Sequence, residues 1–300
     1  MKRTLGVIGV PSSAGAYAPG QEQAPAALRA AGLLAALEAA GLGVVDHGDS
    51  AVWRWRPDRE QRYAQNLAAV VACAAGTAGR VRSALAAGEL PLVLGGDCTV
   101  GIGTVAGHLP EGGRLGLVYL DVHGDLNTPG SVPDGALDWM GVAHMLGEEG
   151  CAPELREVGP RSPLLEAGQI VLLAHDTAHS TERELEAIER LGLARIPRAD
   201  VAADPVRGAR AALAALAECD RLAVHFDVDT IDFTDAPLSE NTGRNAGLSQ
   251  DDAFAALTEV LRDPRISALT ITELNPLHGS EDGSTVAAFG ERLVAALAVA

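Results

Sequence analysis

Basic residues are scarce in this sequence, and lysine occurs only once, as Lys2. The 300 residues contain 23 lysines and arginines against 40 aspartates and glutamates, which gives a formal net charge of −17. A surface this acidic repels nucleic-acid phosphates and anionic lipid head groups. We therefore exclude nucleic acids and membranes as partners and expect small cationic ligands and metal ions instead.

Cysteines are also few, and long apolar runs are absent. The four cysteines, Cys73, Cys98, Cys151 and Cys219, are widely spaced and form no Cys-x-x-Cys motif, which argues against a disulfide framework. No apolar run approaches the ~18 residues of a membrane helix. The apolar stretch 5–10 is too short for a signal peptide. These absences predict a protein of the reducing cytoplasm.

Short apolar segments alternate with longer segments of helical periodicity along the chain. The expected strands are 5–10, 43–46, 90–94, 115–121, 170–173, 222–227 and 268–273, and the expected helices are 24–40, 61–87, 182–191, 206–217, 251–261 and 285–297. This alternation predicts an α/β fold, a single three-layer α/β/α domain over residues 1–300 with a mostly parallel, doubly wound sheet. The Gly-, Pro- and Asn-rich segments 127–138 and 233–248 each follow a strand and are expected to wall a ligand site.

Acidic side chains gather at the ends of two expected strands. Asp121, His123 and Asp125 alternate after one strand, so an extended chain places them on one face, and Asp227 and Asp229 do so after another. A single such aspartate commonly caps a turn, but converging carboxylates repel one another unless a cation joins them. Carboxylates with a histidine suit Mn²⁺. Their number indicates two ions, which would hold a water, lower its pKa and present hydroxide to an electrophilic carbon.

A third motif, Leu94-Gly95-Gly96-Asp97-Cys98, follows another apolar strand and aims Cys98 at the same edge. With it, the sequence resembles the arginase/agmatinase (ureohydrolase) family of dimanganese enzymes. The resemblance begins at Gly6-Val7-Ile8-Gly9-Val10-Pro11-Ser12, passes through Asp46-His47-Gly48-Asp49 and the three metal motifs, and ends at Thr272-Glu273-Leu274-Asn275-Pro276. It implies an arginase-like fold and a hydrolase with two Mn²⁺ ions per chain that acts on a small guanidino substrate.

The resemblance also implies roles for individual residues. Asp121 and Asp227 match positions that bridge both ions. Glu273 matches the acidic residue that pairs with the substrate guanidinium, and Asn127 matches an arginase-like contact to the substrate α-carboxylate. Asn127 thus favours an α-amino-acid substrate over a decarboxylated one such as agmatine. The implied metal ligands carried over from the motifs are Asp121, His123, Asp125, Asp227 and Asp229.

Two positions depart from the usual family pattern. Cys98 stands where most relatives have a histidine ligand, so either its thiolate binds the metal or it is a small buried residue in a degraded site. Asp138 stands where arginases have a proton-shuttling histidine, and it joins Asp125 and Glu273 as a candidate catalytic residue. With Asn127 retained, these departures resemble the Nω-hydroxy-L-arginine hydrolase branch, which releases hydroxyurea and ornithine.

The contact to the substrate amine is less well defined by the sequence. Glu182 or Glu184 fits this role, although an acid in the first turn of a helix also complements the helix dipole. Hydrolysis of L-arginine, agmatine, another guanidino acid or formimidoylglutamate stays an alternative, as do a non-catalytic metal-binding relative and a single-zinc amidohydrolase. Relatives are often trimers or hexamers, so we expect a homo-oligomer without excluding a monomer.

Overall fold

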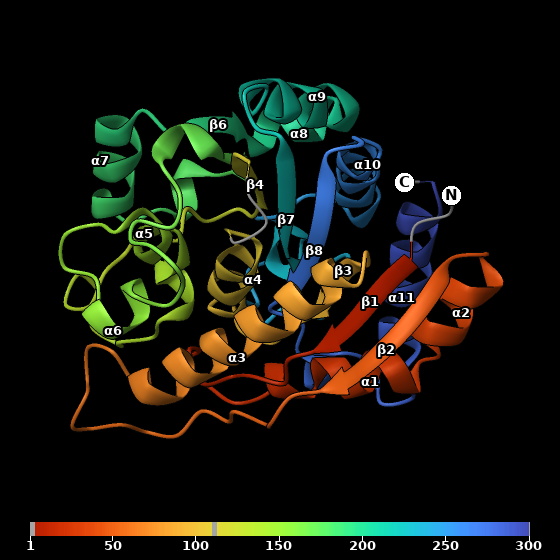
Figure 1. Ribbon diagram of the computed structural model, residues 1–300, viewed down its shortest axis with the longest axis horizontal. Coiled ribbons are helices and arrows are strands. Elements are labelled where there is room, and N and C mark those ends of the chain that lie inside the picture. The colour runs from red at the N-terminus through yellow and green to blue at the C-terminus, as the bar shows by residue number, and fades with distance from the viewer. Residues whose placement is uncertain (1–3, 110–112, 300) are drawn as a thin grey trace.

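The computed structural model describes residues 4–109 and 113–299, and within them eight parallel strands form one sheet (Figure 1). Neighbouring strands are parallel throughout, in the order β2-β1-β3-β8-β7-β4-β5-β6. The chain passes from β3 over β8 and β7 to β4, which creates a topological switch point at the centre of the sheet. The strands are β1 (Thr4–Gly9), β2 (Gly43–Asp49), β3 (Leu90–Leu94), β4 (Leu115–Leu120), β5 (Ile170–His175), β6 (Ala194–Pro197), β7 (Arg221–Asp227) and β8 (Ile266–Thr272).

Helices cover both faces of this sheet, which confirms the expected three-layer architecture (Figure 1). One layer holds α3 to α7, and the other holds α1, α2 and α8 to α11. The helices are α1 (Ala24–Ala30), α2 (Leu33–Ala39), α3 (Leu67–Ala86), α4 (Val100–His108), α5 (Gly141–Leu146), α6 (Pro153–Arg156), α7 (Glu182–Leu191), α8 (Arg198–Ala203), α9 (Pro205–Ala215), α10 (Gln250–Leu261) and α11 (Ser284–Ala298).

Successive side chains of a strand enter cores on opposite faces of the sheet. On β4, Val118 and Leu120 pack into the core that contains Phe289 of α11. Leu117 and Tyr119 of the same strand pack into the core beneath α3, α4 and α5. A parallel sheet covered on both faces needs strands that are apolar throughout rather than alternating, and β4 has that pattern.

Several element boundaries differ from the expectation. The helix expected over 24–40 is two helices, because Gly32 between α1 and α2 has φ +85°, a left-handed conformation that interrupts a right-handed helix. The helix expected over 61–87 begins only at Leu67, after the left-handed Asn66. The expectation also omitted β6, α4, α5, α6 and α8.

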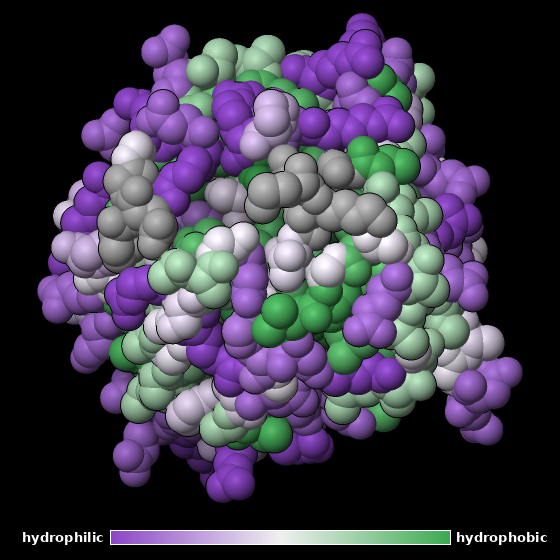
Figure 2. All heavy atoms as spheres, turned by 45° about the vertical axis from the view of Figure 1, so that its right-hand side comes forward, coloured by the Kyte–Doolittle hydropathy of each residue, from purple (hydrophilic) through white to green (hydrophobic). Residues whose placement is uncertain are grey.

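The surface is mainly hydrophilic on the side that carries α10 and α11. Figure 2 shows hydrophilic residues over much of this view, a group of hydrophobic residues near its centre, and moderately hydrophobic residues that reach its right-hand and lower left edges. Within the described ranges, the helices lack the combination of length and apolar character that crossing a bilayer requires.

Candidate metal centre

Four adjacent strands end at one pocket. β3, β8, β7 and β4 are neighbours in the middle of the sheet, and the segment after each carries a predicted site residue. As expected, segments 127–138 and 233–248 both contribute to the pocket wall. Tyr17, Glu240 and Asn241 also line it and were not singled out from the sequence. The predicted site residues that line the pocket are Cys98, His123, Asp125, Asp138, Asp227, Asp229 and Glu273.

Asp121, His123 and Asp229 form a first cluster of metal-ligating type, here called the outer group, with one ligand atom of each within 4.8 Å of the others. The Nδ1 atom of His123 lies 3.3 Å from Asp121 Oδ1 and 3.1 Å from Asp229 Oδ2. Asp121 is also fixed by its own turn, because its Oδ1 accepts the backbone N–H of His123 at 2.7 Å. The strand ends of β4 and β7 thereby bring three predicted ligands together.

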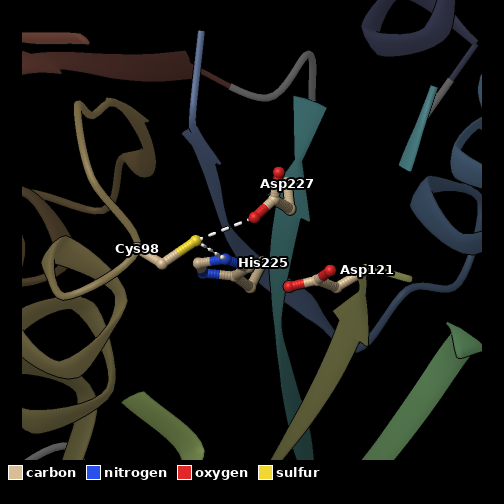
Figure 3. Close-up of side chains that lie close together, drawn as sticks. All are labelled: Cys98, Asp121, His225 and Asp227. Carbon is tan, nitrogen blue, oxygen red and sulfur yellow. Dashed lines mark hydrogen bonds between the residues drawn. The ribbon is translucent and has the colours of Figure 1, made fainter. Parts of the chain in front are cut away.

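Cys98, Asp121, His225 and Asp227 form a second cluster, the inner group, and all four side chains are buried. The thiol of Cys98 donates to Asp227 Oδ2 at 2.9 Å, and its Sγ lies 3.3 Å from His225 Nε2 (Figure 3). His225 was not among the residues predicted for the site. The signal was present in the sequence, since His225 lies two positions before Asp227 on β7 and therefore faces the same side.

Burial and mutual repulsion shift the pKa values of these acids. Burial, with the charge of Asp229, raises the pKa of Asp121 to about 6. Burial, with Asp229 and Asp121, raises the pKa of Asp227 well above its usual range. Burial, with Asp227 and further carboxylates, does the same to the thiol of Cys98. By contrast, burial lowers the pKa of His225 to about 3, so its imidazole is neutral. Such a set of acids is stabilised in its ionised form when cations bind among them.

Two buried oxygen atoms of this cluster test whether a cation fits. Asp121 Oδ2 and Asp229 Oδ1 are both buried and have no hydrogen-bond partner among the described residues. An unsatisfied buried carboxylate oxygen is costly, and a divalent cation removes that cost. Carboxylate, imidazole and thiolate groups are all metal ligands in proteins. The donor set at this sheet edge therefore fits metal ions.

Asp125 lines the same pocket but belongs to neither group. Its backbone is left-handed, with φ +50°, a conformation that aspartate tolerates better than most residues. The phenol of Tyr119 donates a hydrogen bond to Asp125 Oδ2. Tyr119 lies on β4, two residues before Asp121, and thus positions the Asp125 carboxylate from that strand.

Glu273 follows β8 directly and reaches across to β3. Its Oε1 accepts the backbone N–H of Cys98 at 2.8 Å, and its Oε2 accepts Nε2 of Gln21 at 2.8 Å. The residue has φ +63°, and a left-handed non-glycine residue of this kind stores backbone strain. Burial, with the charge of Asp138, raises the pKa of Glu273 well above its usual range. Two hydrogen bonds therefore hold the Glu273 carboxyl group beside the candidate metal ligand Cys98, although the backbone of Glu273 is strained.

The remaining predicted contacts lie on the segment after β4 and on α7, and none of them is among the residues that line the pocket. Asn127 is buried, its Oδ1 accepts the hydroxyl of Thr181 at 2.8 Å, and its Nδ2 has no partner among the described residues. Glu184 is buried in a capping box with Thr181 and accepts the N–H of Leu126 at 3.2 Å. Glu182 is exposed in the first turn of α7 and does not line the pocket.

Asp138 and His144 occupy different surroundings. Asp138 lines the pocket, and burial, with the nearby Asp97 carboxylate, raises its pKa well above the usual range. His144 is buried in α5, where its Nδ1–H donates to Met140 O at 2.7 Å and its Nε2 accepts the N–H of Ala152 at 3.1 Å. His144 therefore has a structural role, and Asp138 is a titratable group whose charge acts on Glu273.

Similarity to one family extends over nearly the whole chain. The model of the arginase family matches residues 3–299. An arginase from Brevibacillus brevis is 32% identical over 287 residues, 94% of each chain, and arginase-1 from Homo sapiens is 29% identical over 92% of this chain and 86% of its own. The crystal structure of an arginase from Bacillus subtilis matches with a TM-score of 0.86 at 27% identity, over 98% of both chains. The chain therefore belongs to the arginase family of metal-dependent ureohydrolases.

Proposed function

We propose that this protein hydrolyses a guanidino C–N bond of an arginine-like amino acid, with Nω-hydroxy-L-arginine preferred over L-arginine. The products are ornithine and either hydroxyurea or urea. The single observation that carries the proposal is the cluster of three aspartates, two histidines and a cysteine at one sheet edge, in a chain of the arginase family. The four free, buried cysteines are consistent with activity in the cytoplasm.

Two Mn²⁺ ions fit the inner and outer groups, and Asp121 belongs to both. When bound, such a pair of ions supplies a water of lowered pKa as the nucleophile. The carboxylates of Asp121, Asp227 and Asp229 balance the positive charge of the ions, and Asp125 lies beside them in the pocket lining. The role of these residues is to fix the ions.

The pocket is built for a cationic substrate. Among the residues that the structure describes, its lining contains seven carboxyl groups and no lysine or arginine. Glu273 is 6% exposed. A buried carboxylate has lost most of its hydration, and a cationic partner that donates hydrogen bonds to it compensates for that loss. The backbone N–H of Cys98 and the amide of Gln21 hold the Glu273 carboxylate in place. A guanidinium paired with Glu273 would have its carbon beside the metal ligands.

Asn127 supplies the preference for an amino acid over an amine. Because its Oδ1 is taken by the Thr181 hydroxyl, the free group of the amide is its Nδ2, a hydrogen-bond donor. A donor of this kind complements an α-carboxylate, which agmatine lacks. The neighbouring Glu184 is satisfied by the helix cap and by Leu126, so it orders this segment.

Asp138 replaces a histidine as the proton donor for the leaving amine. Burial raises its pKa, which favours the protonated carboxyl group, the form that a general acid requires. An N-hydroxyguanidine is less basic than a guanidine and needs less help to react, which favours the hydroxylated substrate where the shuttle histidine is missing.

Steady-state turnover of three substrates tests the proposal. Purified protein loaded with Mn²⁺ is assayed on Nω-hydroxy-L-arginine, L-arginine and agmatine under identical conditions. We expect kcat/KM to fall in that order. Activity confined to agmatine would contradict the role of Asn127, and no activity on any of the three would contradict the proposed reaction.

A further inference from the structure

The inner group adds an imidazole to the ligands that the family resemblance implies. The ligand atoms of Cys98, Asp121, His225 and Asp227 lie within 4.8 Å of one another, and all four residues are buried. Figure 3 shows the imidazole of His225 on β7 facing the sulfur of Cys98, with Asp227 above and Asp121 directly after the end of the neighbouring strand β4. His225 is thus placed as a ligand would be placed.

The surroundings of His225 fix which nitrogen atom faces the cluster. Its Nε2 lies 3.3 Å from the Sγ of Cys98 and 3.0 Å from the hydroxyl oxygen of Thr272. The ring of Tyr119 stacks on the imidazole with centroids 4.1 Å apart and an interplanar angle of 12°. On the Nδ1 side, a Cβ at Gly101 would lie 2.7 Å from that nitrogen, so only glycine leaves room for the ring. The imidazole is therefore held with Nε2 toward the cluster.

The inner and outer groups differ in chemical softness. The outer group offers two carboxylates and one imidazole, a set dominated by oxygen. The inner group offers a thiolate and an imidazole beside two carboxylates. Thiolate and imidazole ligands are typical of zinc, whereas carboxylates suit manganese. The partnerless Oδ2 of buried Asp121 is independent support for a cation at this place.

We propose that His225 and Cys98 both bind the inner metal ion and that the inner position selects Zn²⁺ over Mn²⁺, while the outer position stays a manganese site. The inference rests on the binuclear centre of the proposed function and refines which ion each position prefers. With Mn²⁺ alone, both positions fill. When both ions are offered, the inner position takes Zn²⁺ and the centre becomes a mixed one.

Metal competition tests this directly. Because Zn²⁺ binds most nitrogen, oxygen and sulfur sites more tightly than Mn²⁺, metal-free protein is equilibrated with free Mn²⁺ in large excess over free Zn²⁺, and the bound ions are counted by plasma mass spectrometry. We expect one Zn²⁺ and one Mn²⁺ per chain. His225→Ser and Cys98→Ser are each expected to lower the ratio of bound Zn²⁺ to bound Mn²⁺ at least about tenfold. Loss of a residue that only hydrogen-bonds to a metal ligand already weakens metal binding by about 10- to 100-fold. The matched control is His47→Ser, an exposed histidine bonded to Glu89, which should leave the ratio unchanged.

Spectroscopy on the unmodified protein gives a readout independent of folding of the variants and of activity. Co²⁺ added to the metal-free protein should give a sulfur-to-metal charge-transfer band, and X-ray absorption of the zinc-loaded protein should report one sulfur and one imidazole nitrogen in addition to oxygen. Zinc bound without sulfur or imidazole, or a His225→Ser protein with the wild-type ratio and spectrum, would overturn the inference.

The failure of this inference can be told apart from the failure of the proposed function. Two Mn²⁺ ions per chain, retained against Zn²⁺ and accompanied by guanidino hydrolysis, would overturn the selectivity alone. Less than one tightly bound ion of either metal would overturn both.

Discussion

Replacing Glu273 with glutamine should remove the carboxylate that pairs with the substrate cation and keep the hydrogen bonds around it. The two carboxylate oxygens accept the N–H of Cys98 and the Nε2 of Gln21, both at 2.8 Å. The Oε1 of Gln21 is buried without a partner among the described residues, so the Gln21 amide can turn over and accept from the new amide. The backbone strain at φ +63° is common to both residues and cancels. Glu273→Gln should therefore fold and keep its metal, since Glu273 belongs to neither ligand group.

The size of the effect follows from burial of the carboxylate, which is 6% exposed. A hydrogen bond to a charged group contributes ~1.5–3 kcal/mol, and breaking a buried ion pair costs ~3–5 kcal/mol. These ranges meet at about 3 kcal/mol, which corresponds to a roughly 150-fold decrease in kcat/KM.

The assay is ornithine release from Nω-hydroxy-L-arginine, with metal content measured on the same samples. The control is Glu186→Gln, the same chemical change at an exposed position of α7, which should alter kcat/KM by no more than about twofold. A Glu273→Gln protein that keeps its metal ions and loses less than about threefold in kcat/KM would refute the pairing of Glu273 with the guanidinium.

Three other variants test separate parts of the account. Asn127→Ala should raise KM for L-arginine and its N-hydroxy form roughly tenfold, because a charge-assisted hydrogen bond is lost, and leave KM for agmatine unchanged; an equal rise for all three would contradict it. Asp138→Asn should lower kcat by about 10²-fold or more and abolish the fall of kcat at high pH, where the acid loses its proton; an unchanged pH profile would exclude a general acid. Burial lowers the pKa of His144 to about 4 from 6.5, so its stabilisation is complete above pH 6.5 and is lost as pH falls toward 4. Between pH 7 and 5 the wild type should therefore lose about 2 kcal/mol more than His144→Gln in urea unfolding, and equal losses would show that His144 does not titrate.

Much of the candidate site could be predicted because parallel topology brings the carboxyl ends of strands to one edge. Asp121 and His123 after β4 meet Asp229 after β7 for that reason alone. His225 follows the same alternation with Asp227, yet a histidine inside an apolar strand resembles a satisfied core residue. His225 is recognisable as a candidate ligand only because Cys98, which follows β3, lies close to it on the other side of β8. That proximity depends on tertiary structure.

The helix α4 shows why part of the fold could not be predicted. Its sequence is rich in glycine, which disfavours helix by about 1 kcal/mol per residue relative to alanine. The glycines are needed for close packing: a Cβ at Gly103 would lie 2.5 Å from the carbonyl oxygen of Ala74, and one at Gly107 would lie 2.7 Å from that of Ala78. Contact with α3 thus overrides local propensity. The short strand β6, with alternating exposure, gives too few residues for a pattern.

The central claim is that a metal centre at this sheet edge hydrolyses the guanidino group of an amino acid. The most direct test is to strip the protein of metal, reload it with Mn²⁺, and measure ornithine and hydroxyurea released from Nω-hydroxy-L-arginine by mass spectrometry. The account predicts equal amounts of both products from the reloaded protein and none from the stripped protein. Ornithine release that persists without metal, or no ornithine from a protein holding two ions per chain, would contradict it.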